Sequence, residues 1–96
     1  MQTELQGIKI DLLILIADYF KVLSEPIRIK ILLSLRQNEK TVSEIVKEVN
    51  SSQPNVSKHL SVLIKAGLVT RRQVKNVAYC SIGDKRIWQI CDVSCR

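Results

Sequence analysis

Two short amphipathic segments, separated by a three-residue polar turn, constrain the fold of this chain more than any other feature. The first begins with Thr41-Val42-Ser43-Glu44, which has the sequence of a capping box: Thr41 caps a helix and Glu44 reaches back to it. The apolar residues behind it recur at helical spacing and are Val42, Ile45, Val46 and Val49. We therefore expect a short helix that ends near Asn50.

The second segment begins at Ser52 or Gln53, directly after the turn Asn50-Ser51-Ser52. Pro54 stands in its first turn, where the missing N–H costs nothing, and Gly67 supplies a left-handed stop. Its expected buried stripe consists of Val56, Leu60, Leu63 and Ile64. Two helices joined by such a turn form a helix-turn-helix motif.

The apolar period changes after Gly67. Residues 68–74 and 77–82 have the pattern of two strands around a Lys75-Asn76 turn, and Gly83-Asp84 ends the second strand. A hairpin directly after a helix-turn-helix is a wing, and a last helix is expected from about Lys85 to the C-terminus. The sequence therefore predicts a mainly α fold with a small β-hairpin, a single winged helix-turn-helix domain over residues 1–96.

A strongly apolar helix is expected before this motif, from about Leu5 to Leu23, followed by a helix that starts at Ser24-Glu25-Pro26 and precedes a polar break at 37–40. The stripe of the first helix consists of Ile8, Leu12, Leu15, Ile16 and Tyr19, widened by Leu13, Ile14 and Phe20. A helix that is apolar over most of its circumference must be covered on more than one side. In so short a chain, a second subunit is the natural cover.

The length and composition favour a cytoplasmic protein without a membrane segment. The apolar run 12–17 is far shorter than the roughly 18 residues that span a bilayer. No signal peptide is expected at the N-terminus, where Glu4 and Asp11 flank the early segment. Three cysteines are too few and too clustered for a secreted disulfide scaffold.

The distribution of charge is more informative than the net charge of +6. Residues 50–83 contain no Asp or Glu, and their basic side chains are Lys58, His59, Lys65, Arg71, Arg72 and Lys75. An acid-free basic surface on the second helix and the hairpin is what contact with DNA phosphates requires. The alternative is a solvated basic face with no partner.

The start of the second helix carries small side chains that form hydrogen bonds. We expect Gln53, Asn55 and Ser57 to contact base edges in the major groove of double-stranded DNA, and Lys58, Arg71, Arg72 and Lys75 to contact phosphates. Ser52 serves as an N-cap, a role that leaves room for a phosphate contact. For His59 we expect packing or a phosphate contact rather than metal ligation.

Two runs of this sequence resemble the arsenic-repressor (ArsR/SmtB-type) family of winged-helix regulators. The run 23–32, LSEPIRIKIL, resembles the opening motif of that family, and the run 52–69, SQPNVSKHLSVLIKAGLV, is close to its signature. The resemblance implies a homodimer joined through the first and last helices, bound to an imperfect inverted repeat and released by an inducer. The implied interface residues are Leu12, Leu15, Ile16, Tyr19, Ile87 and Trp88.

The chain departs from two metal sites that are common in this family. Thr41 and Ser43 occupy the positions of a Cys-x-Cys ligand pair on the third helix, so that site is missing. A zinc site on the last helix needs several histidines, and the only histidine here is His59 in the second helix of the motif.

Cys91 and Cys95 stand four residues apart on the expected last helix and therefore share one face. Together with Cys80 or with the partner subunit, they are candidate ligands for a soft metal or metalloid ion such as arsenite. A redox switch without a cofactor is the second interpretation, through a disulfide that unwinds the last turn or through a polysulfide bridge. The third is that all three thiols simply pack as small apolar side chains.

These observations predict a sequence-specific transcriptional repressor released by a thiol-reactive inducer, which is a soft metal or metalloid, reactive sulfur or an oxidant. Two other functions compete with it: a constitutive DNA-binding protein, for instance viral or from a mobile element, and a winged helix used for protein–protein contact. An enzyme is not expected, because the chain has no Ser–His–acid or Cys–His arrangement and no phosphate-binding glycine loop.

Overall fold

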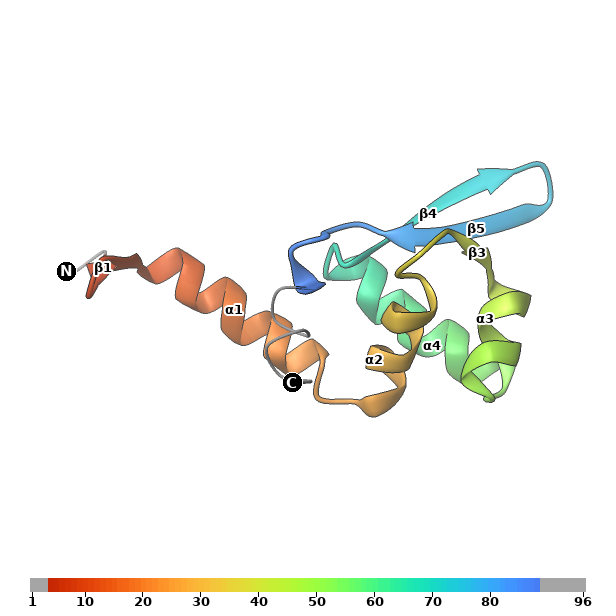
Figure 1. The fold of residues 1–96 in the computed structure, drawn as a ribbon, viewed down its shortest axis with the longest axis horizontal. Coiled ribbons are helices and arrows are strands. Elements are labelled where there is room, and N and C mark those ends of the chain that lie inside the picture. Colours follow the sequence, from red (N-terminus) through yellow and green to blue (C-terminus); the bar gives the residue numbers. More distant parts are fainter. Residues whose placement is uncertain (1–3, 89–96) are drawn as a thin grey trace.

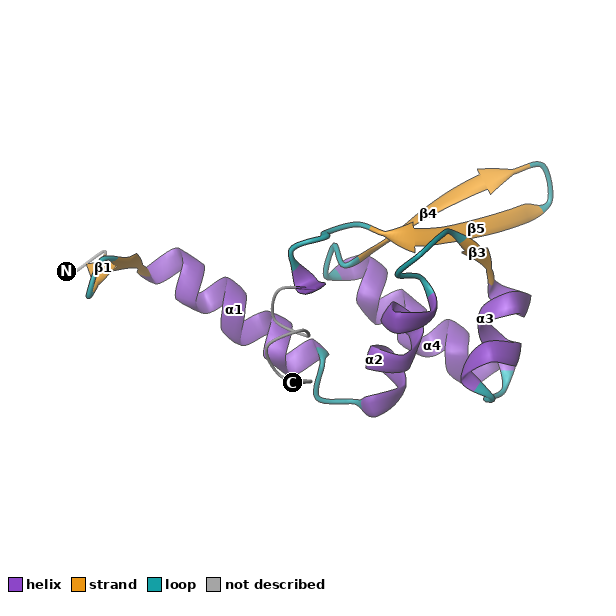
Figure 2. Ribbon diagram, viewed as in Figure 1, coloured by secondary structure: helices purple, strands orange, loops and turns teal. Residues whose placement is uncertain are grey.

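Three helices form the body of the structure, a computed structural model that describes residues 4–88 (Figure 1). They are α2 (Pro26–Ser34), α3 (Val42–Val49) and α4 (Gln53–Lys65). A small antiparallel sheet covers one side of them (Figure 2). This arrangement is a winged helix-turn-helix, which confirms the predicted fold class.

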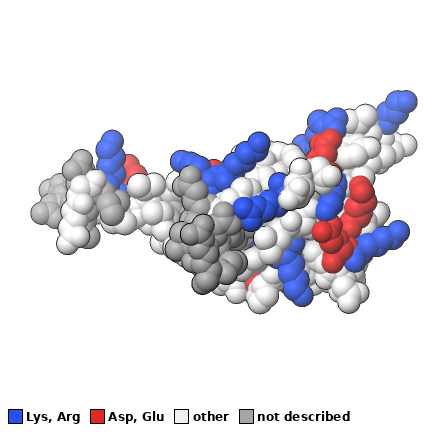
Figure 3. Space-filling view, in the orientation of Figure 1, with Lys and Arg blue, Asp and Glu red and all other residues white. Residues whose placement is uncertain are grey.

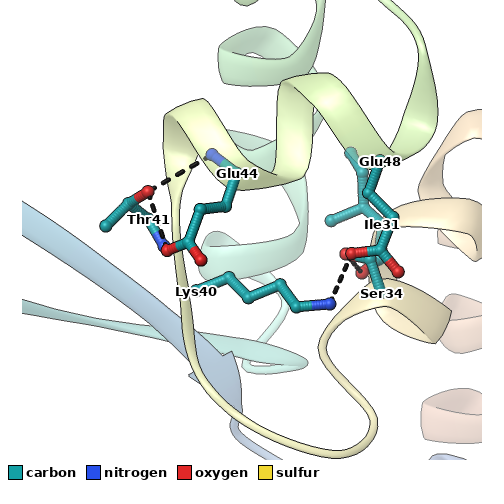
Figure 4. Close-up of polar contacts among 6 residues, drawn as sticks. All are labelled: Ile31, Ser34, Lys40, Thr41, Glu44 and Glu48. Atoms are coloured by element: carbon teal, nitrogen blue, oxygen red, sulfur yellow. Dashed lines mark hydrogen bonds and ion pairs between the residues drawn. The ribbon is translucent and has the colours of Figure 1, made fainter.

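The ends of α3 and α4 are set by the side chains that the sequence indicated. The Thr41 hydroxyl accepts a hydrogen bond from the Glu44 amide at 3.2 Å, and the Glu44 carboxylate accepts one from the Thr41 amide at 3.0 Å (Figure 4). Ser52 caps α4 by accepting from the Asn55 amide. Gly67 ends it with a φ of 80°, a value that glycine adopts without steric cost.

The wing consists of β4 (Val69–Val74) and β5 (Val77–Ile82), paired from Val69–Ile82 at the base to Val74–Val77 at the tip. A third strand was not predicted: β3 (Lys40–Thr41) pairs with β5 opposite Tyr79 and Cys80. The sequence indicated only a polar break at Lys40. Two residues are too short for a strand pattern to be visible in the sequence.

The hydrophobic core lies between the three helices and the sheet, and it reaches past the wing to the last described turn. Its buried members include Ile31, Ile45, Leu60 and Leu63 from the helices. The others are Leu32, Leu35, Val49, Val56, Leu68, Val69, Cys80 and Ile87. The core thus joins the wing to the helices as one unit.

Helix α1 (Ile10–Val22) begins five residues later than expected. The predicted start at Leu5 is wrong because residues 4–9 form a small hairpin of β1 (Glu4–Leu5) and β2 (Ile8–Lys9). Gln6 and Gly7 make its turn with φ values of 52° and 82°. Such left-handed values suit a two-residue hairpin turn and interrupt a helix.

Only the first turn of the expected last helix falls within the described residues. Its start is held by Asp84, whose carboxylate accepts a hydrogen bond from the Arg86 amide at 3.0 Å. Trp88 packs against the core beneath the Arg36 guanidinium, which lies 4.8 Å from the ring centroid. No helix within residues 4–88 is long and apolar enough to cross a membrane.

Candidate nucleic-acid interface

The first half of α4 presents a polar face to solvent and an apolar face to the core. Gln53, Ser57 and Lys58 are exposed, whereas Val56 and Leu60 are buried. The helical period separates the two sets, so Gln53, Ser57 and Lys58 lie on the accessible face. Three of the predicted contact residues are therefore placed where a groove of DNA can reach them.

The turn before α4 engages two other predicted contact residues in local hydrogen bonds. The Asn55 side-chain amide donates to the Ser51 hydroxyl at 3.0 Å, and the Ser52 hydroxyl accepts from the Asn55 backbone amide at 3.3 Å. These bonds fix the angle at which the chain enters α4. Asn55 is half-buried and shapes the turn, while Gln53 stands free on the surface.

An open groove separates the starts of α3 and α4 from the wing. Its lining residues are Thr41, Val42, Ser43, Gln53, Arg71, Asn76, Val77 and Ala78. Two helix N-termini face this region, and each leaves backbone N–H groups without intrahelical partners. The groove therefore combines hydrogen-bond donors with one exposed guanidinium, which suits an anionic ligand.

The wing is basic, but it is not free of acidic neighbours (Figure 3). Arg71 and Lys75 are exposed. The Arg72 guanidinium instead lies 2.6 Å from the Glu39 carboxylate and 5.1 Å from the centroid of the Tyr79 ring. Glu39 precedes β3, outside the acid-free stretch, so sequence reasoning missed this pairing.

Helix α3 itself carries two acidic side chains, Glu44 and Glu48. Lys40 forms an ion pair with Glu48, which draws the strand β3 toward that helix (Figure 4). The Thr41 amide and hydroxyl hold the pKa of the exposed Glu44 carboxyl below its usual value. Both carboxylates of α3 are thus paired with residues of β3.

His59 does not reach this surface, which corrects its placement among the DNA contacts. Its side chain is buried, with 7% of the residue exposed, and its Nδ1 accepts a hydrogen bond from Arg28 Nε at 3.1 Å. Burial, with the nearby Arg28 and Lys58 charges, lowers the pKa of the imidazole. The structure thus places His59 in the interior, hydrogen-bonded to Arg28.

Helix α1 projects from the body, and none of its residues 10–22 is buried (Figure 1). Its large exposed apolar side chains include Ile14 and Phe20, which are 56% and 54% exposed, together with Leu12 and Leu15. Tyr19 and Ile16 are half-buried, and the Tyr19 hydroxyl donates to Asp84 at 2.8 Å. An apolar helix that the rest of residues 4–88 leaves so exposed favours association.

Ile87 does not belong to that exposed face. It is 0% exposed and lies in the core of its own chain, so it offers no surface to a partner. The expected contribution of Ile87 to a dimer interface is therefore corrected to a core role, while Trp88 is half-buried beside it.

The model of a family described as bacterial regulatory protein, arsR family, matches residues 25–71. An uncharacterised HTH-type transcriptional regulator of Methanocaldococcus jannaschii is 36% identical over 75 residues, which cover 77% of this chain and 84% of the relative. The chain belongs to the ArsR family. Proteins of this family are DNA-binding transcriptional regulators and not enzymes, as the sequence indicated.

Two further comparisons place this ArsR-family chain among its relatives. A probable mercury resistance operon repressor of Streptomyces lividans is 42% identical over 72 residues, which cover 74% of this chain but 57% of the relative. A homodimeric winged helix-turn-helix DNA-binding domain from Mycobacterium bovis, described as a possible ArsR-family regulator, has a TM-score of 0.77 at 27% identity. That match covers 88% of this chain and 82% of the Mycobacterium domain.

Of the three thiols in this ArsR-family chain, the structure describes one. Cys80 on β5 is a free thiol with 1% of the residue exposed, and burial raises its pKa. Cys91 and Cys95 lie outside the described residues. Within residues 4–88, no group of three His, Cys, Asp or Glu side chains is placed to hold a metal ion.

Proposed function

We propose that this ArsR-family protein is a homodimeric, sequence-specific repressor of transcription that binds operator DNA in the cytoplasm. The observation that carries the proposal is the exposed polar front of α4, with Gln53, Ser57 and Lys58, beside the groove that Arg71 borders. In this arrangement α4 enters the major groove and the wing follows the phosphates. Repression is supported by the Streptomyces relative, a probable operon repressor.

The proposed dimer forms through the apolar face of α1. Leu12, Ile14, Leu15 and Phe20 are exposed in the single chain, and a second copy supplies a surface of the same kind. The Mycobacterium domain that shares this fold is homodimeric. A two-fold dimer presents two α4 helices, so its operator is an inverted repeat.

The test is fluorescence anisotropy with a duplex selected by this protein from a random pool, compared with a scrambled duplex. We expect tight binding to the selected duplex and a weaker affinity for both duplexes as salt rises, because phosphate contacts release counterions. Sedimentation of the free protein checks the dimer. Equal affinity for the two duplexes contradicts sequence-specific recognition.

We further propose that a thiol-reactive inducer acts at Cys91 and Cys95 and releases the operator. A soft metal or metalloid ion and a reactive sulfur species or oxidant are the two chemical classes. The burial of Cys80 argues against its joining the other two thiols without an opening of the core. Inert packing of all three thiols is the alternative outcome.

The inducer is tested on the operator complex by titration with arsenite, cadmium, a polysulfide and hydrogen peroxide. Release by one class should be lost in the double variant Cys91→Ser/Cys95→Ser and kept in Cys80→Ala. Release that persists in the double variant places the sensor elsewhere. A complex that none of the four reagents disturbs favours a constitutive DNA-binding protein.

A further inference from the structure

One arginine joins three helices of the structure. Arg28, in the first turn of α2, donates from Nε to His59 Nδ1 in α4 at 3.1 Å and from Nη1 to the Val22 carbonyl at 3.0 Å. Val22 is the last residue of α1. The planar guanidinium thus holds the end of α1 and the middle of α4 in one fixed geometry.

This contact matters because few contacts within residues 4–88 hold α1 against the body. None of its residues is buried; Tyr19, Val22 and the following Leu23 pack against the core cluster, and the Tyr19 hydroxyl donates to Asp84 at 2.8 Å. The carbonyls in the last turn of a helix lack intrahelical partners and carry partial negative charge. A cation bound at the Val22 carbonyl is therefore well placed to hold α1 at its root.

The other end of the contact lies on the helix that faces DNA. His59 follows Lys58 and is buried beneath the exposed front of α4. Its Nδ1 accepts from Arg28, so that nitrogen carries no proton and the imidazole is neutral. The charged groups that act on His59 are Arg28 of α2, Lys58 of α4 and Glu25 before α2.

We propose that Arg28 is a positioning residue that fixes the direction of α1 relative to α4. The proposal rests on the proposed dimeric function, because α1 is there the helix that joins the subunits. Arg28 then sets the distance between the two α4 helices, and thereby the half-site spacing that the dimer selects. The residue acts through Val22 and His59 and contacts no DNA itself.

The experiment measures affinity for the selected operator and for operators whose half-sites are one base pair closer or farther apart. Wild-type protein should prefer one spacing. Arg28→Lys keeps the charge but has a single nitrogen, and Arg28→Gln loses the charge; both should reduce the spacing preference by about three- to thirty-fold. Lys30→Gln, on an exposed position of α2, is the matched control and should keep the preference.

Binding to a duplex with one half-site separates positioning from general damage. The Arg28 variants should bind it as wild type does, since the surface of α4 is unchanged. Folded, dimeric Arg28 variants with an unaltered spacing preference overturn the proposal. A wild-type protein that is monomeric overturns the dimeric function, and this inference with it. A wild-type dimer without a spacing preference overturns this inference alone.

A second pair of variants carries the test if both Arg28 variants unfold. His59→Gln offers an acceptor oxygen to Arg28, whereas His59→Leu removes it. The Gln variant should retain more of the spacing preference than the Leu variant. Equal preference in the two variants overturns the proposal.

Discussion

The Arg72 guanidinium lies 2.6 Å from the Glu39 carboxylate, although 33 residues separate them in the chain. The pair ties the wing to the loop before β3, and the same guanidinium lies 5.1 Å from the centroid of the Tyr79 ring. A phosphate that approaches Arg72 must compete with this carboxylate. Arg71, one residue earlier, lines the groove, and Glu39 is paired with Arg72 instead.

Replacing the acidic partner should strengthen DNA binding. Glu39→Gln removes the competing carboxylate, and an exposed ion pair of this kind contributes about 0–1 kcal/mol, so we expect a gain of up to about fivefold in affinity. The gain should appear equally on selected and random duplexes and shrink at high salt. Glu48→Gln, which removes the same charge beside Lys40, is the control. Weaker binding by Glu39→Gln would show that the pair instead orients the wing for DNA.

Gln53 and Lys58 should separate base contacts from phosphate contacts. Gln53→Ala is expected to relax discrimination at one base pair by roughly 1–3 kcal/mol, because the amide is a bidentate base reader. Lys58→Ala should weaken binding to all sequences and lower the salt slope by about one. Anisotropy on a panel of single-substitution duplexes measures both. Equal losses on specific and random DNA in the two variants would contradict this division.

The free energy of unfolding should decrease as the pH falls below neutrality, because of His59. Its folded-state pKa is lowered by burial, whereas the unfolded imidazole titrates near the usual value of about 6.5. Both states are neutral at pH 7.5, so the full stability is present there. As the pH falls through about 6.5, the unfolded state binds a proton before the folded state does. The free energy of unfolding therefore decreases until the pH reaches the folded-state pKa of His59.

Urea unfolding between pH 7.5 and 5 measures this effect. His59 is the only histidine of the chain, so His59→Gln should flatten the profile in that window. A wild-type profile as flat as that of the variant would show that His59 is protonated without cost in the folded state.

A side chain at Gly83 should destabilise the protein, because this residue lies where the end of the wing meets the end of α4. A Cβ at this position would lie 2.6 Å from the Gly67 carbonyl oxygen, and the Gly83 amide donates to the Leu68 carbonyl at 2.8 Å. Gly83→Ala therefore forces backbone apart and should cost about 1–3 kcal/mol of stability. Gly67→Ala meets open space and should cost only the left-handed backbone penalty, about 1–2 kcal/mol. Denaturant melts of both variants measure the difference, and an unchanged Gly83→Ala midpoint refutes the close approach.

The features that the sequence predicted well are those that local chemistry determines. The capping box at Thr41, the Ser52 cap, the Gly67 stop and the two wing strands each depend on residues a few positions apart. Hydrophobic periodicity likewise separated the buried and exposed faces of α4. These signals survive in a single sequence because no distant partner is needed to create them.

The features that sequence reasoning missed depend on distant partners or on very short elements. Arg72 with Glu39, and His59 with Arg28, are pairs more than thirty residues apart that no periodic pattern encodes. The strands β1, β2 and β3 have two residues each, so the apolar period near Ile8 favoured a helix instead. Ile87 was expected at the dimer interface, because an apolar stripe does not indicate whether its own chain or a partner covers it.

Cys80 offers a measure of how often the sheet opens. It lies in the central strand β5 between β3 and β4, and its thiol is buried and held in the unreactive, protonated form. A thiol reagent can modify it only during a local opening, so the labelling rate under native conditions reports the free energy of that opening. Comparing this rate for free and DNA-bound protein would reveal whether DNA holds the wing closed.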